Sequence, residues 1–204
     1  MSEDLFNRAV LRPGMILGRM TPCAISRAIV LRTAGVWPLA RGTAWSHDAI
    51  VIQHNHRWYL GDAEMGRKAR LTPIEEWENA MRCDGVRVVA LWPTGATEQM
   101  GQAAAWWWQC NVYGQAYDAT AIRDIAWRWL AEKCGNRVGR EEDYYCTEGC
   151  RDAWLFGAEL DPWRPKLSPT PGTTRKRYLQ GRFVAMPEAL TEAGRSYAIH
   201  LSSC

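Results

Sequence analysis

Residues 46–60 read SHDAIVIQHNHRWYL, the stretch with the strongest β-strand pattern in the chain. Its first half is rich in β-branched and apolar residues, as strands are. A polar turn, HNHR, follows it, and the aromatic run WYL comes next. Two β-rich runs around a short polar turn predict a β-hairpin. With the turn centred near His54 and Asn55, the hairpin would place His47 opposite Asp62, which lies fifteen residues further along the chain.

Other elements surround this hairpin. The turn Pro13-Gly14 leads into a short strand, and GVRVVALW at residues 85–92 reads as another. Helical patterns cover residues 96–110 and 119–133, and a third helix begins around Cys146 and runs through Phe156. Strands and helices alternate without regular βαβ units, so we predict an α+β fold with an antiparallel sheet.

Length and composition exclude several classes of protein. The 204 residues fit one domain, and no apolar run is long enough for a membrane span, so we expect no stable membrane insertion. The N-terminus, MSEDLFNRAV, lacks the basic and apolar regions of a secretory signal. We therefore expect synthesis in the cytoplasm, with any export by a non-classical route. A net charge of +3 does not favour a nucleic-acid partner.

The cysteines do not suggest a disulfide or zinc framework. They number seven, an odd count, and their spacings are irregular. Such a pattern is typical of buried thiols in a reducing compartment. The pair His54 and His56 could bind a metal, but no cluster of carboxylates or cysteines lies near them in sequence, and a solvated turn is the simpler interpretation. We predict no metal and no cofactor.

Three residues form a candidate catalytic set. Cys146 follows a polar, aromatic loop and precedes a helix, where the helix dipole favours a thiolate; the alternative is a small buried hydrophobic residue. His47 could act as its base, although a lone His at a strand start is more often a solvated residue. Asp62 could hold the imidazole in the required tautomer. Glu64 lies on the same face of the strand and could take that role instead.

The order of these motifs resembles the circularly permuted NlpC/p60 cysteine peptidases, the YiiX-like group. In that group the His strand precedes the Cys helix, as it does here. The matching segments are residues 12–14, 45–51, 61–63, 113–118 and 145–148. The resemblance implies a papain-like fold whose antiparallel sheet packs against helices. It also implies Cys146 as the nucleophile, His47 as the general base, and an acid on the second hairpin strand. Asp62 stands where the family usually has Glu, which keeps Glu64 open.

The resemblance further implies cleavage of an amide bond, with peptidoglycan stem peptides as the leading substrate. Such an enzyme would suit a bacterial or phage protein, or a delivered effector with an immunity or delivery partner. Trp45, Tyr117, Tyr145 and Arg123 are candidate substrate contacts. The alternatives are a lipid or thioester acyl hydrolase or acyltransferase of the same fold, and a non-catalytic binding module. We expect residues 1–160 to form the catalytic domain, and residues 161–204 to form a Pro-rich connection and an extension packed on it.

Overall fold

A computed structural model describes residues 3–24, 26–27, 29–30, 44–64, 67–116, 146–164 and 169–199. Its sheet has six strands in the order β4-β3-β2-β1-β5-β6, and every neighbouring pair is antiparallel. The strands are β1 Ile16–Met20, β2 His47–His54, β3 Arg57–Asp62, β4 Arg70–Pro73, β5 Arg87–Pro93 and β6 Phe183–Ala185. The predicted α+β class with an antiparallel sheet is confirmed.

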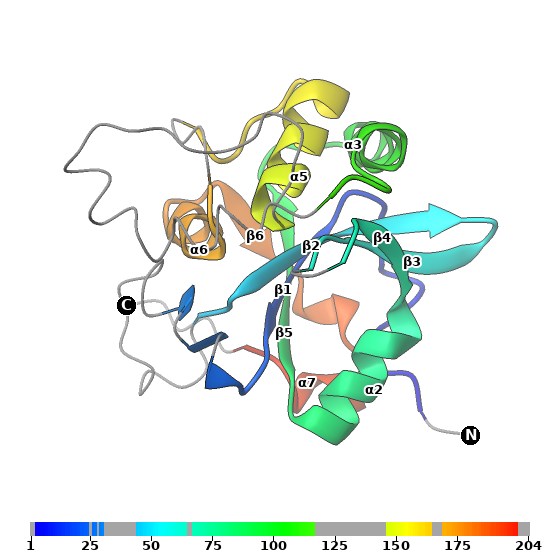
Figure 1. The fold of residues 1–204 in the computed structure, drawn as a ribbon, viewed down its shortest axis with the longest axis vertical. Helices are drawn as coiled ribbons and strands as arrows, with labels where there is room; N and C mark the ends of the chain where they lie inside the picture. The colour runs from blue at the N-terminus through cyan, green and yellow to red at the C-terminus, as the bar shows by residue number, and fades with distance from the viewer. Residues whose placement is uncertain are drawn as a thin grey trace.

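The helices cover both sides of this sheet. Those whose bounds lie within the described residues are α2 Ile74–Asp84, α3 Glu98–Asn111, α5 Cys146–Asp152, α6 Pro171–Leu179 and α7 Glu192–Arg195. A π-helical segment, Ala153–Gly157, continues α5. In Figure 1, α3, α5 and α6 lie on the upper side of the sheet and α2 lies below it. Within the described ranges, no helix combines the length and apolarity that a bilayer crossing requires.

The hairpin forms as predicted, but its turn is one residue later. Asn55 and His56 are the two turn residues, with φ values of 49° and 59°. Two consecutive left-handed residues make the tight turn that matches the twist of a hairpin, and Asn tolerates this conformation. The register therefore pairs Ile50 with Gly61. In that register Asp62 is diagonal to His47 rather than opposite it, which corrects the predicted pairing while keeping both side chains on one face.

The sheet packs tightly against α3. Gly14 precedes β1 with a φ of 87°, a conformation that favours glycine. A Cβ atom there would also lie 2.6 Å from the Gly101 backbone in α3. The indole of Trp154 donates a hydrogen bond of 2.9 Å to the Gly14 carbonyl. These close contacts join the start of β1 to the helices above the sheet.

The C-terminal part of the chain differs from the prediction. Part of the segment interpreted as a Pro-rich loop is the start of α6, which has Pro171 in its first turn. Thr170 caps this helix by a reciprocal capping box with Thr173. After α7, Ala198 forms a single bridge with Val88 of β5. The predicted helix at 119–133 lies outside the described residues.

Candidate active site

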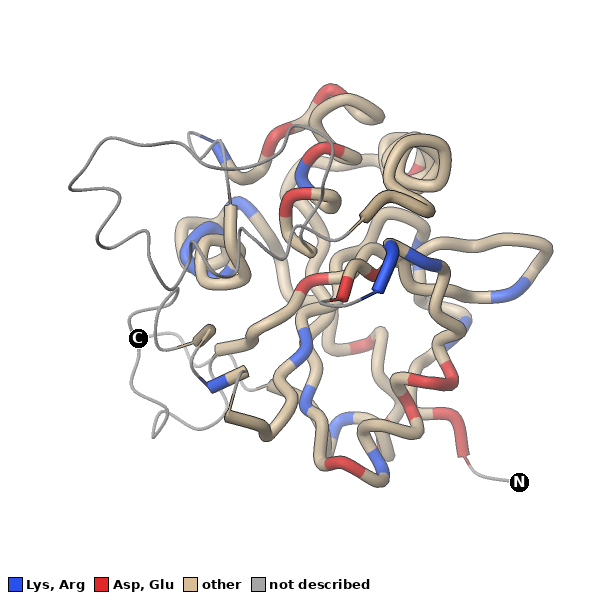
Figure 2. Tube along the Cα trace, in the orientation of Figure 1, with Lys and Arg blue, Asp and Glu red and all other residues tan. Residues whose placement is uncertain are grey.

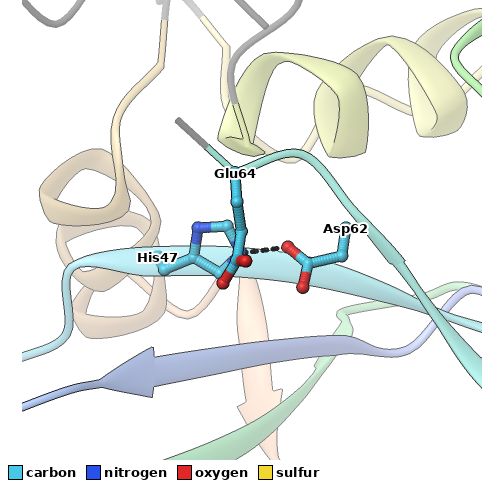
Figure 3. Close-up of side chains that lie close together, drawn as sticks. All are labelled: His47, Asp62 and Glu64. Atoms are coloured by element: carbon cyan, nitrogen blue, oxygen red, sulfur yellow. Dashed lines mark hydrogen bonds and ion pairs between the residues drawn. The ribbon is translucent and has the colours of Figure 1, made fainter. Parts of the chain in front are cut away.

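His47 and Asp62 converge at one end of the hairpin. His47 begins β2, Asp62 ends β3, and both side chains are buried. Nε2 of His47 lies 2.6 Å from Oδ1 of Asp62, the contact dashed in Figure 3. Thr72 donates a hydrogen bond of 3.4 Å to the other carboxylate oxygen. The acid is thus fixed on both oxygens, and its bond orients the imidazole.

Glu64 lies beside this pair but is engaged elsewhere. Figure 3 shows its side chain next to the His47 ring. Its carboxylate forms an ion pair with Arg19 and a longer one, of 3.9 Å, with Arg67. The Arg19 guanidinium also lies 4.8 Å from the centroid of the Trp77 ring. Of the two acids that the sequence left open, Asp62 is therefore the one that hydrogen-bonds the ring.

Cys146 completes the set. It is the first described residue of α5, and its side chain is largely buried, with 7% of its surface exposed. Its thiol lies close enough to the His47 ring to raise the pKa of that imidazole. Because Nε2 of His47 faces Asp62, Nδ1 is the ring nitrogen left for the thiol. The three residues of the predicted set therefore lie together.

The charges of this set favour a protonated imidazole. Burial by itself would lower the pKa of His47, but the neighbouring Asp62 and Cys146 and the hydrogen bond to Asp62 raise it to about 10. Burial likewise opposes ionisation of Asp62, yet the neighbouring His47 and Arg19 charges lower the pKa of its carboxyl. At neutral pH the ring carries its second proton, and it can stabilise a thiolate beside it.

Trp45 does not fit the predicted role of substrate contact. Its indole is fully buried, and Nε1 donates a hydrogen bond of 2.6 Å to Asp48. A Cβ atom on Gly18 would lie 2.7 Å from the indole ring, so the ring is packed directly on β1. Trp45, just before β2, is therefore a core residue. The other predicted contacts, Tyr117, Tyr145 and Arg123, lie outside the described residues.

Sequence reasoning missed a second buried cluster. Asp48, the neighbour of His47, is completely buried and accepts hydrogen bonds from Trp45, from Thr147 at 2.7 Å and from Thr174 at 2.8 Å. Burial raises the pKa of Asp48, and the three donors oppose that shift. An Asp in an otherwise apolar strand was the available signal, because a buried carboxylate requires such donors.

Cys150 is the other thiol near the set. It lies one helical turn after Cys146 and is fully buried. Burial, reinforced by the nearby Asp48, Cys146 and Asp62 charges, raises the pKa of Cys150 well above its usual range. A buried thiol of this kind stays protonated and unreactive. Cys23, Cys83 and Cys110 are exposed and lie outside the set.

His47, Asp62 and Glu64 also form the one group of potential metal ligands in the part of the chain that is described. Their ligand atoms lie within 4.8 Å of one another. A divalent cation there would have to displace Arg19 from Glu64 and the proton from Nε2 of His47. It would also sit beside the Arg19 guanidinium, which repels it. The geometry fits an ion-pair network better than a metal centre.

Comparisons with known proteins bear on the fold. No family model matches the sequence, and no curated protein matches it. Among solved structures, the chain is similar to the crystal structure of metalloprotein yiiX from Escherichia coli O157:H7 (DUF1105), with a TM-score of 0.51 and 18% identity. The match covers 88% of this chain and 94% of that chain. The likeness shows the fold. It agrees with the predicted YiiX-like architecture, whereas the papain-like permutation stays a prediction.

Proposed function

We propose that this protein is a cysteine hydrolase with Cys146 as nucleophile, His47 as its acid–base partner and Asp62 as the orienting acid. The observation that supports it most is the convergence of these three side chains from α5, β2 and β3. A thiol, an imidazole and a carboxylate that lie together are a set that performs acyl transfer through a covalent intermediate.

The raised pKa of His47 refines the first step. Because the pKa of the ring is about 10, His47 is positively charged at neutral pH and would stabilise negative charge on the attacking sulfur. The sulfur bonds to the substrate carbonyl carbon, and the carbonyl oxygen takes the negative charge. Backbone N–H groups near Cys146 would stabilise that oxyanion.

Collapse of this intermediate releases the amine. His47 donates its Nδ1 proton to the leaving nitrogen, the C–N bond breaks, and a thioester with Cys146 remains. Neutral His47 then removes a proton from water, whose oxygen attacks the thioester. The C–S bond breaks, the acid product leaves, and the imidazolium–thiolate pair is restored. Asp62 stays ionised throughout and keeps the ring in place.

The proposed substrate is an amide in peptidoglycan stem peptides, and support for it comes from the sequence resemblance. Stem peptides lie outside the cytoplasmic membrane, so this substrate entails export or delivery of the protein. An esterase or thioesterase acting on acyl lipids would use the same three residues. The choice of substrate therefore needs a direct assay.

Mass spectrometry of purified muropeptides after incubation with the full chain tests this proposal. A new stem-peptide fragment, absent with Cys146→Ala, is the expected result. A parallel panel of phospholipids and acyl thioesters identifies the alternative, because fatty acid release there without muropeptide cleavage would move the function to acyl hydrolysis. Turnover that survives Cys146→Ala, that EDTA abolishes and that zinc restores would contradict a cysteine hydrolase altogether.

A further inference from the structure

We infer that Asp48 is a positioning residue that fixes Cys146 against His47, and that α6, through Thr174, is part of this clamp. The inference rests on the proposed function and adds to it residues that do not touch substrate. It assigns the segment after residue 160 a direct part in building the site.

Two residues of the clamp are the sequence neighbours of the two reacting residues. Asp48 follows His47 in β2, and Thr147 follows Cys146 in α5. Oδ2 of Asp48 accepts a hydrogen bond of 2.7 Å from Thr147 and one of 2.8 Å from Thr174 in α6. Oγ1 of Thr147 also lies 3.8 Å from Sγ of Cys146. A single buried carboxylate thus ties the nucleophile's helix to the strand that carries the imidazole.

The directions of these hydrogen bonds require a carboxylate at position 48. Nε1 of Trp163 can only donate, and it donates to Oγ1 of Thr174 at 2.9 Å. The single hydroxyl proton of Thr174 is therefore directed to Asp48. Trp45, which also can only donate, occupies the other carboxylate oxygen. Three donors with fixed directions surround the Asp48 side chain, so both of its terminal atoms must accept hydrogen bonds. Both oxygens of a carboxylate accept, whereas the NH2 group of an amide can only donate.

A second tie reinforces the same arrangement. Arg151 in α5 donates a hydrogen bond of 2.9 Å to Asp161. The other oxygen of Asp161 accepts from the backbone N–H of Trp163 at 3.0 Å. Helix α5 is therefore held at two points, by Asp48 through Thr147 beside Cys146 and by Asp161 through Arg151 a turn further along, and α6 bonds the first of these acids. A shift of about 1 Å between reacting groups can cost about 10²-fold in rate.

The test compares variants that change one hydroxyl. Thr174→Val keeps the shape of the side chain but leaves Asp48 short of one donor, whereas Thr174→Ser keeps the hydroxyl. Thr191→Val is the matched control, because it removes a hydroxyl that caps α7 and hydrogen-bonds the Asp4 and Leu5 carbonyls, on another part of the molecule. Each full-length variant is measured for melting temperature, for the rate of Cys146 alkylation by iodoacetamide, and for kcat and KM on muropeptides.

We expect Thr174→Val to lower Cys146 alkylation and kcat by about tenfold or more, within the range that misplaced reacting groups produce. KM should change little, Thr174→Ser should recover most of the loss, and Thr191→Val should keep the parent rates even if it melts earlier. Equal alkylation and kcat in Thr174→Val and the parent protein would overturn the inference while leaving the proposed function intact. A parent Cys146 that reacts no faster than Cys110 would instead overturn the proposed function, and the inference with it.

Discussion

The Asp62 carboxylate lies diagonally across the β2–β3 ladder from His47, with Oδ1 2.6 Å from Nε2 of the ring. A diagonal pair on one face of a sheet is within reach of long or ring-containing side chains. Continued beyond β3, the same register would place Glu64 opposite His47. The Glu64 carboxylate pairs with Arg19 instead. The ion pair between Glu64 and Arg19 thus leaves Asp62 as the acid that meets the imidazole.

Exchanging the two acids tests this assignment. Asp62→Asn should lower kcat by about two to four orders of magnitude, as loss of an orienting acid does in related triads. Glu64→Gln should have a much smaller effect, because its carboxylate pairs with Arg19 rather than with the ring. Steady-state kinetics of both variants supply the measurement. The reverse ranking would transfer the orienting role to Glu64, and two unaffected variants would leave a Cys–His dyad.

Cys146 should be the reactive thiol among the described cysteines. It lies beside a ring that carries a positive charge at neutral pH, whereas Cys150 is fully buried and stays protonated. Brief treatment with iodoacetamide, followed by peptide mapping, should modify Cys146 before the exposed Cys83 and Cys110, despite its lower exposure. Cys146→Ala should abolish turnover, since no other group forms the acyl intermediate. Faster labelling of Cys83 or Cys110 would count against the thiolate.

The raised pKa of His47 predicts a pH window. His47 titrates near 6.5 in the unfolded chain and at about 10 in the folded protein. Its contribution to folding stability is therefore fully present below pH 6.5 and is lost as the pH rises through about 10. The imidazole NMR signals of His47 should stay in the charged position at pH 8. Titration near pH 6.5, as in an exposed histidine, would disprove the ion pair.

Part of this arrangement could be predicted from sequence. Local patterns are enough for the hairpin, for α3 and for the helix at Cys146, because period and composition reflect short-range preferences. The predicted register was wrong because the turn lies one residue later than expected. The register depends on the left-handed φ values of Asn55 and His56. The Thr170-Pro171 start of α6 is a recognisable helix signal that the surrounding prolines concealed.

The Asp48 cluster could not be predicted in the same way. Thr147 and Thr174 lie 99 and 126 residues from Asp48 in sequence, and no local pattern relates them. The burial of Trp45 has the same origin, because its indole donates to the same carboxylate. Long-range hydrogen bonds of this kind follow from tertiary packing, which one sequence does not specify by inspection.

The hairpin turn offers a stability test that is separate from the site. His56 adopts a φ of 59°, which costs a non-glycine residue about 1 kcal/mol or more. His56→Gly should therefore raise the free energy of unfolding by a fraction of that cost, since glycine also gains freedom in the unfolded chain. His56→Val, which is β-branched, should lower it. Urea unfolding of both variants measures the difference, and turnover should be unchanged in His56→Gly.

Zinc addition tests the ion-pair interpretation of His47, Asp62 and Glu64. A zinc site at a 100-fold excess of ligand over its Kd would stabilise the fold by about 2.7 kcal/mol. We expect no such gain in the parent protein, because Arg19 holds Glu64 and a proton occupies Nε2 of His47. Arg19→Ala removes the competing cation, so it should strengthen any response of the melting temperature to zinc. A zinc-dependent rise in the parent protein that disappears in Glu64→Gln would establish the three residues as a metal centre instead.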